Sequence, residues 1–116
     1  MAGKVIHIRD GVEDGAFRQG VVYIGDRMPP WMSPTGAYLP RSDWYNPYKI
    51  DKPNKPRDGS REEVIEKYER YLTSERPDLS ERLGELEGKT LACWCRPKAC
   101  HGDVLLKLIE ERKRGE

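Results

Sequence analysis

Three short stretches of the chain have the polar and apolar pattern of β-strands. Residues 4–9 alternate between apolar and polar side chains, which predicts a short strand. Residues 20–25 are mainly β-branched or aromatic and are bounded by glycines, and residues 89–95 form an apolar run after Gly88. We therefore predict strands over these three ranges.

Helical periodicity appears only in the second half of the chain. Ser60 and Glu63 have the spacing of a capping box, which predicts a helix that begins there. Its apolar stripe consists of Val64, Ile65, Tyr68, Tyr71 and Leu72. A shorter helix is predicted between Pro77 and Gly88, and a final helix over residues 100–112.

The order of these elements predicts an α/β fold. With 116 residues, the chain is expected to fold as a single domain over residues 1–116. The helix, helix, strand, helix order of the second half favours parallel pairing with the earlier strands. The expected architecture is a small sheet of parallel strands with helices packed on it, a Rossmann-like layered arrangement.

Residues 26–59 differ from the rest of the chain because they contain seven of its nine prolines. This density excludes a helix or a long strand. The same range carries the aromatic residues Trp31, Tyr38, Trp44, Tyr45 and Tyr48. So much apolar surface predicts an ordered loop that packs on the body of the domain.

Composition excludes several classes of protein. Lys and Arg number 21 against 20 Asp and Glu, which excludes a uniformly basic nucleic-acid coat and an acidic tail protein. The absence of a long apolar run and of a secretory signal predicts a cytoplasmic protein without a membrane partner. Its three cysteines are then expected to be thiols, metal ligands or redox groups. Few amides, many charges and nine prolines favour a thermophilic source.

The net charge of the chain is close to zero, but the charges are unevenly distributed along it. Residues 41–57 hold five basic and two acidic side chains, whereas residues 60–87 hold five basic and nine acidic ones. The first range is a candidate contact for a nucleotide or a single strand. The second is interpreted as a solvated face.

Residues 91–103 contain all three cysteines and one of the two histidines. The carboxyl end of the last strand and the amino end of the last helix should meet there, where open α/β sheets bind ligands. The helix terminus favours an anion, and Arg96 and Lys98 add two donors for phosphate. We expect Cys95, Cys100 and His101 to lie close together at this end of the sheet, faced by Trp44 or Asn46.

Three interpretations of this window remain open. Cys93, Cys95, Cys100 and His101 have the donor count of a zinc site, although their spacing is more crowded than usual. Alternatively, Cys100 or Cys95 is a reactive thiolate beside basic groups at a helix N-terminus. In the third interpretation, Cys93 and Cys95 are small apolar residues in a buried strand. Asp103 fits the first helical turn in each of them.

The proline-rich range holds a second candidate cluster, Arg41, Trp44, Asn46 and Tyr48. The two rings are able to stack on a base. The alternative is that they cover a small core while the charges are solvated.

Three motifs resemble those of a small family of unknown function found in bacteria and their phages. They are Tyr23–Gly25, Trp44–Tyr48 and Glu85–Leu105, the last containing Cys-Trp-Cys-x-Pro-x-x-Cys-His-Gly-Asp. The resemblance covers about residues 20–110. This chain has Tyr45 where the family has Gly and Tyr48 where it has Phe. The resemblance groups the cysteine-histidine window with Trp44 and Asn46 in one site, but implies no activity.

The favoured hypothesis is a protein directed at nucleotides or nucleic acids, either a modifying enzyme or a phage protein that sequesters nucleotides. Its phosphate would lie at Gly102 and its base would stack on an aromatic ring, with Asn46 reading a base edge and Trp94 among the contacts. In an enzyme, Cys100 or His101 would be the nucleophile or acid–base group, and Asp103 would orient His101. The alternative is a zinc-stabilised interaction module without catalysis.

Overall fold

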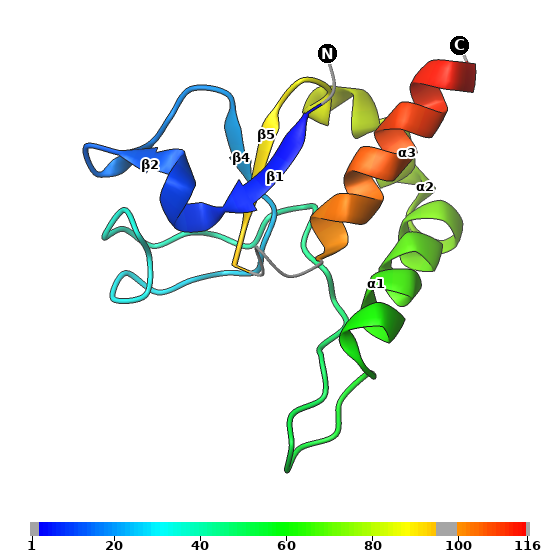
Figure 1. Ribbon diagram of the computed structural model, residues 1–116, viewed down its shortest axis with the longest axis horizontal. Helices are drawn as coiled ribbons and strands as arrows, with labels where there is room; N and C mark the ends of the chain where they lie inside the picture. The colour runs from blue at the N-terminus through cyan, green and yellow to red at the C-terminus, as the bar shows by residue number, and fades with distance from the viewer. Residues whose placement is uncertain (1–2, 95–99, 116) are drawn as a thin grey trace.

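The computed structural model describes residues 3–94 and 100–115 and contains a parallel sheet (Figure 1). Its strands are β1 (Lys4–His7), β4 (Val21–Tyr23) and β5 (Thr90–Cys93). The spatial order is β1-β5-β4, and β5 is parallel to both neighbours. The predicted α/β class with parallel strands is confirmed, and each strand is shorter than predicted.

The two faces of the sheet have separate apolar cores. Val5, Leu91 and Val22 are paired across the sheet and pack toward the helices. The next row, Ile6 and Tyr23 around Ala92, packs on the opposite side. This alternation follows from the two-residue period of a strand. Leu91 and Cys93 therefore share one face of β5, with Ala92 and Trp94 on the other.

The helices form a layer on one side of the sheet (Figure 1). The first is α1 (Arg61–Arg70), which starts with the predicted capping box of Ser60 and Glu63. The chain continues through a π-helical turn (Tyr71–Glu75), α2 (Pro77–Glu81) and a 3₁₀ turn (Leu83–Leu86). The last helix is α3 (His101–Gly115), and it packs on α1, β1 and β5. Within the described ranges no helix has the length and apolar character needed to cross a bilayer.

No α-helix of the described residues covers the other face of the sheet. A 3₁₀ turn (Ile8–Gly11) follows β1 and leads into the antiparallel hairpin of β2 (Val12–Glu13) and β3 (Ala16–Phe17). The predicted first strand therefore ends two residues early. The reason is local, because the His7 side chain accepts a hydrogen bond from the Arg9 amide at 3.2 Å and caps the turn.

The proline-rich range is only partly packed on the body. Trp44 is buried, with 4% of its surface exposed, whereas Trp31 is 84% and Tyr38 56% exposed. The prediction that these aromatic residues all pack down is therefore wrong for Trp31 and Tyr38. Backbone hydrogen bonds of 2.9 Å in both directions between Met28 and Leu39 close this loop. The loop between Met28 and Leu39 is closed by hydrogen bonds of its own backbone, so its shape does not depend on burying the Trp31 and Tyr38 rings.

Candidate functional site

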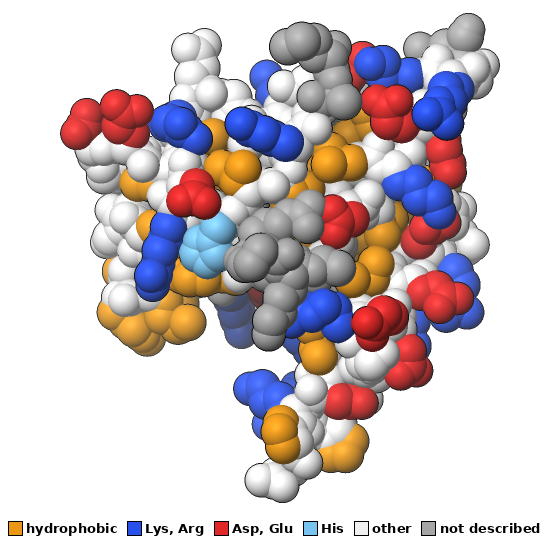
Figure 2. Space-filling view, in the orientation of Figure 1, with side chains coloured by type: hydrophobic (Ala, Val, Ile, Leu, Met, Phe, Trp, Pro, Cys, Tyr) orange, Lys and Arg blue, Asp and Glu red, His pale blue; other side chains and the backbone are white. Residues whose placement is uncertain are grey.

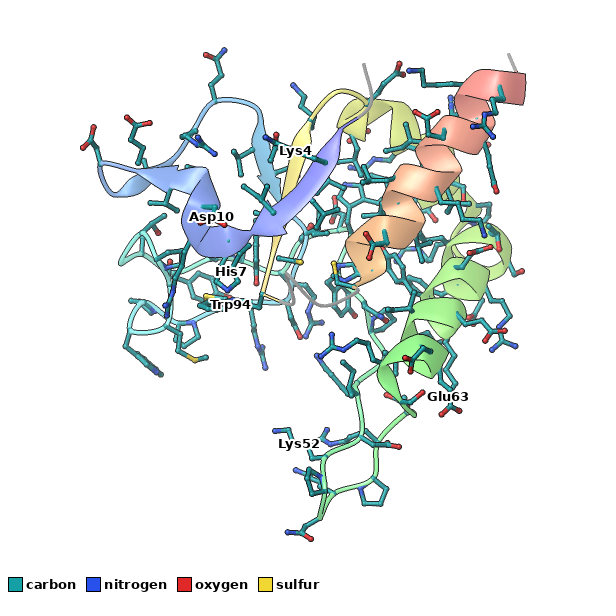
Figure 3. All side chains as sticks on the ribbon, viewed as in Figure 1. Lys4, His7, Asp10, Lys52, Glu63 and Trp94 are labelled. Atoms are coloured by element: carbon teal, nitrogen blue, oxygen red, sulfur yellow. The ribbon has the colours of Figure 1, made fainter. Side chains whose placement is uncertain are left out.

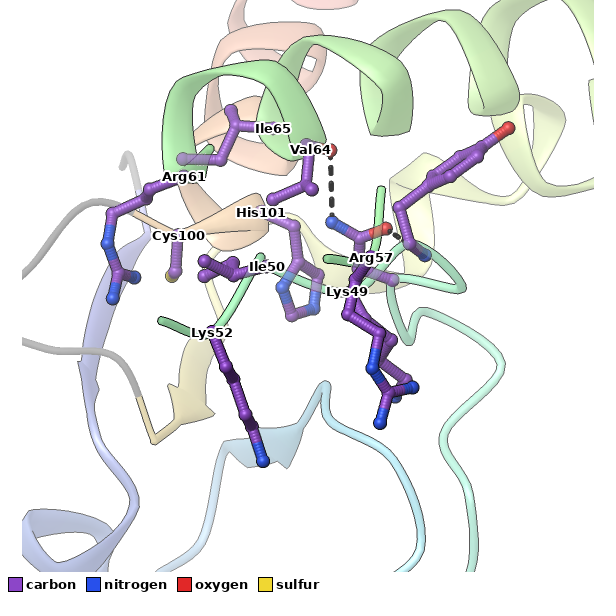
Figure 4. A pocket seen from close by; sticks show the side chains of 11 residues that line it. Lys49, Ile50, Lys52, Arg57, Arg61, Val64, Ile65, Cys100 and His101 are labelled. Carbon is purple, nitrogen blue, oxygen red and sulfur yellow. Dashed lines mark hydrogen bonds between the residues drawn. The ribbon is translucent and has the colours of Figure 1, made fainter. Parts of the chain in front are cut away.

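A cavity of about 400 Å³ lies beside the amino end of α3 (Figure 4). Its walls come from residues 46–57, from the first turn of α1 and from Cys100 and His101. Four basic residues line it, Lys49, Lys52, Arg57 and Arg61, together with the apolar Ile50, Val64 and Ile65. No acidic residue is among the described residues of this lining. Its volume is within the range of small-molecule sites, and its charge favours an anion.

A projecting hairpin supplies part of the basic wall, with Lys52 and Lys55 paired across it (Figure 3). The acidic residues at its base are used by the backbone. Asp51 Oδ1 accepts hydrogen bonds from the amides of Arg57 and Gly59, and Asp58 Oδ2 accepts one from the Lys49 amide at 2.7 Å. These contacts fix the hairpin and keep both carboxylates occupied at its stem. Lys52 and Arg57 therefore line the cavity, whereas the carboxylates of Asp51 and Asp58 bind backbone amides of the hairpin.

His101 lies in the wall that this cavity shares with a second one. Its Nε2 is 2.7 Å from the Ile24 carbonyl oxygen, at the end of β4. A carbonyl only accepts, so Nε2 carries the proton and a neutral ring keeps its lone pair on Nδ1. Burial lowers the pKa of His101, opposed by the Ile24 hydrogen bond and by Asp103. The ring also meets Tyr68 edge-to-face at 4.9 Å.

Trp44 serves the core and does not face a ligand. The Tyr68 hydroxyl donates to the Trp44 carbonyl oxygen at 2.6 Å, which ties the loop to α1. The Trp44 ring is buried in the main core cluster, and Arg82 lies 5.8 Å from its centroid. A ring with 4% exposure has no open face on which a base can stack, so the structure favours the alternative that Trp44 covers the core.

Asn46 and Tyr48 do line the cavity, but the Asn46 amide is already engaged. Its Nδ2 donates to the Val64 carbonyl at 3.2 Å and its Oδ1 accepts from the Tyr48 amide at 2.9 Å (dashed in Figure 4). Asn46 therefore holds the loop against α1 through one hydrogen bond at each end of its amide, which leaves one N–H donor and one acceptor lone pair of the side chain. The Tyr48 ring lies 5.8 Å from Lys67 Nζ and edge-on to Tyr71 at 6.3 Å.

The structure brings two of the cysteines together at the end of β5. The sulfur atoms of Cys93 and Cys100 are 3.1 Å apart, and both residues are buried. The Cys100 amide donates to Asp103 Oδ2 at 3.1 Å, so Asp103 closes the first turn of α3. The described hydrogen bond that orients the His101 ring comes from Ile24. The expected orienting role of Asp103 toward this ring stays a prediction, because the Ile24 contact involves Nε2 alone.

Gly102 packs against the sheet and not against the cavity. A Cβ atom at this position would lie 2.8 Å from Val5 Cγ2 and 3.0 Å from Ile24 Cδ1. The residue is a glycine here because α3 approaches β1 closely at its first turn. Gly102 is not among the described residues that line either cavity, and the expected phosphate position there stays a prediction.

A second cavity, of about 300 Å³, adjoins the first and shares Asn46, Lys49 and His101 with it. Cys93 at the end of β5 lines it together with Trp94, the next residue, and Tyr23 lines it from β4. The remaining described lining comes from Gly25, Asp26, Arg27, Met28, Pro29 and Met32. The Trp94 ring meets His7 edge-to-face at 5.3 Å (Figure 3), and its buried Nε1 has no hydrogen-bond partner within residues 3–94 and 100–115.

Asp26 neutralises part of the positive charge at this second cavity. Burial opposes its ionisation, but hydrogen bonds from Arg41 and Lys49 outweigh that effect and hold the pKa of Asp26 at about 2. Arg41 Nε is 2.7 Å and Lys49 Nζ 3.1 Å from its carboxylate. Arg41 also stacks over Tyr45 and does not line either cavity. Its described contacts are those of a residue that holds the loop.

The predicted meeting of Cys100, His101 and Asn46 at this end of the sheet is found, whereas Cys95, Arg96 and Lys98 lie outside the described residues. Sequence reasoning did not single out the basic residues that line the first cavity. The excess of basic side chains over residues 41–57 was the available signal for three of them, Lys49, Lys52 and Arg57.

Comparison with known proteins places the chain among uncharacterised sequences. Residues 11–111 match the family model described as Domain of unknown function (DUF4326). Uncharacterized protein R718 of Acanthamoeba polyphaga mimivirus is 39% identical over 83 residues, covering 65% of this chain and 58% of that protein. No solved structure matches the chain. The expected origin in bacteria and phages stays a prediction, but the match over most of its length means that the chain belongs to the DUF4326 family.

Proposed function

We propose that the protein binds a phosphorylated ligand of the nucleotide class in the basic cavity beside α3. The observation that carries this proposal is the described lining, which holds four basic residues and no acidic one. Lys52 and Arg57 make no salt bridge within the described ranges, so both remain able to contact an anion. The apolar side chains of Ile50, Val64 and Ile65 offer a surface for a base or a sugar.

The location supports the same proposal. The cavity adjoins the carboxyl ends of β4 and β5 and the amino end of α3, where open parallel sheets bind ligands. The dipole of a helix start attracts negative charge. Cys100 and His101 are therefore placed where a bound ligand would meet them.

Isothermal titration calorimetry with nucleoside mono-, di- and triphosphates, ribose 5-phosphate and inorganic phosphate tests the proposal. Lys52→Ala should weaken binding of the phosphorylated ligand about ten- to a hundredfold, because a hydrogen bond to a charged group contributes about 1.5–3 kcal/mol. Lys55→Ala is a matched control, since the two lysines pair across one hairpin and only Lys52 lines the cavity. Equal effects of the two variants, or no binding by any compound, would refute the proposal.

The same compounds separate binding from catalysis. Prolonged incubation followed by mass spectrometry of the ligand distinguishes a modifying enzyme from a protein that only sequesters nucleotides. In an enzyme, Cys100 and His101 are the groups at the cavity wall that are able to act as nucleophile or as acid and base. Cys100→Ser should then abolish turnover while binding persists.

A zinc-stabilised interaction module is the second candidate, because the Cys93 and Cys100 sulfurs lie 3.1 Å apart beside His101. Two thiolates on one tetrahedral zinc are about 3.8 Å apart, since each Zn–S bond is about 2.3 Å long. The two sulfur atoms would therefore have to move slightly farther apart to bind the ion. The described residues include no group of three metal-ligating side chains, and a zinc site would need Cys95. Elemental analysis of protein purified without added metal tests this candidate, and a chelator should lower its melting temperature if zinc is a ligand.

A further inference from the structure

The largest exposed apolar side chains of the described residues gather on one loop. They are Trp31, Met32 and Tyr38, with 84%, 56% and 56% of their surfaces exposed. Figure 2 shows hydrophobic side chains at the lower left of the molecule, where Figure 1 places the loop between β4 and α1. A tryptophan held in water is an uncommon feature, because burying such a ring is worth about 1.5–3 kcal/mol.

The backbone of this loop is fixed by its own hydrogen bonds. The Met28 and Leu39 pair closes it, and the Ser33 amide donates to the Pro29 carbonyl at 3.1 Å. The Ser33 and Thr35 hydroxyls are 2.9 Å apart, and the Gly36 amide donates to the Ser33 carbonyl. The rings are therefore presented by a defined turn, which lowers the entropic cost of binding to them.

The loop adjoins the proposed ligand site. Its residues Met28, Pro29 and Met32 line the second cavity, which shares Lys49 and His101 with the basic one. Arg27 lines the same cavity next to Met28. The second cavity, which also holds Asp26, therefore lies between the basic cavity and the loop that carries the exposed rings.

We propose that the ligand is single-stranded nucleic acid, with one nucleotide in the basic cavity and a neighbouring base stacked on Trp31. This inference rests on the proposed function of the basic cavity. Aromatic rings beside a basic groove are the usual means of holding unpaired bases and their phosphates. The acid-free lining of the basic cavity favours a polyanion over an apolar protein surface or a neutral lipid face.

Fluorescence anisotropy with labelled oligodeoxythymidylates and oligouridylates, of lengths up to about eight nucleotides, tests the inference. Affinity should rise with length above that of the mononucleotide and should fall with increasing salt. Trp31→Ala should weaken binding of the longer strands by about five- to a hundredfold, the effect of losing one stacked base. Trp31→Phe retains a ring and should restore most of that affinity. Because Trp31 is exposed, neither variant should change the melting temperature.

The outcomes separate this inference from the proposal on which it rests. If mononucleotides bind and depend on Lys52, but Trp31→Ala leaves strand binding unchanged, the stacking site is refuted and the cavity proposal stands. If strands bind through Trp31 while Lys52→Ala has no effect and mononucleotides do not bind, the cavity proposal is refuted, and with it the nucleotide position assumed here. If Trp31 is instead required for binding to phosphatidylserine vesicles or for dimer formation, with no strand binding, this surface has another occupant and the inference is overturned.

Discussion

Replacing Gly102 by Ala tests whether this glycine is present for packing or for a ligand. The added Cβ atom would lie 2.8 and 3.1 Å from the two methyl groups of Val5 and 3.0 Å from Ile24 Cδ1. Contacts this short require a neighbour to move. Val5 cannot rotate away easily, because a β-branched side chain in a strand has few accessible rotamers and this one packs against the core. Overpacking of this kind costs about 1–3 kcal/mol of unfolding free energy.

For a chain of this length, that cost corresponds to a melting temperature lowered by about 3–15 °C. Urea denaturation followed by circular dichroism measures the free energy, and calorimetry measures the melting temperature. Gly84→Ala is the control, since a Cβ there has no neighbour within 4 Å and the backbone is not left-handed. It should be neutral or slightly stabilising. If Gly102→Ala keeps full stability but loses ligand binding, the packing explanation is wrong and the residue contacts the ligand.

Two further predictions concern the side chains around His101. Burial lowers the pKa of His101 below its usual 6.5, so the unfolded chain takes up this proton at a higher pH than the folded one. The unfolding free energy should therefore fall as the pH drops below about 6.5 and be retained above it. Urea denaturation at several pH values from about 8 to 5 measures this, and the unfolding free energy of His101→Asn should fall less over the same range. Tyr68→Phe leaves the buried Trp44 carbonyl without its partner and should cost about 1–3 kcal/mol in urea denaturation. A loss below about 0.5 kcal/mol would mean that this hydrogen bond does not hold the loop.

Local pattern was sufficient for much of the scaffold. The capping box at Ser60 marked the start of α1 because its two hydrogen bonds join residues three positions apart. The alternation along β5 assigned Leu91 and Cys93 to one face because side-chain direction in a strand depends only on position. The meeting of Cys100 with the end of β5 followed from the short connection between them. These features are set by neighbours in the chain, so the sequence by itself determines them.

The roles of the loop residues depend on partners that are distant in sequence. Trp44 is buried and Trp31 exposed because Tyr68, 24 positions away from Trp44, binds the Trp44 carbonyl, whereas the loop that carries Trp31 closes on itself. His101 is held by Ile24, 77 positions away. Composition records neither contact, so it could not tell which aromatic ring packs into the core and which faces solvent.

The charge of the cavity illustrates the same division. The sequence placed an excess of basic residues over residues 41–57, but it also placed Asp51 there and Asp58 just beyond. Only the folded hairpin assigns those carboxylates to backbone amides and brings Lys52 and Arg57 to the cavity wall. The sequence thus determined which charges are present. The tertiary structure decided which of them face a ligand, because a hydrogen bond to a particular amide depends on how the chain returns on itself.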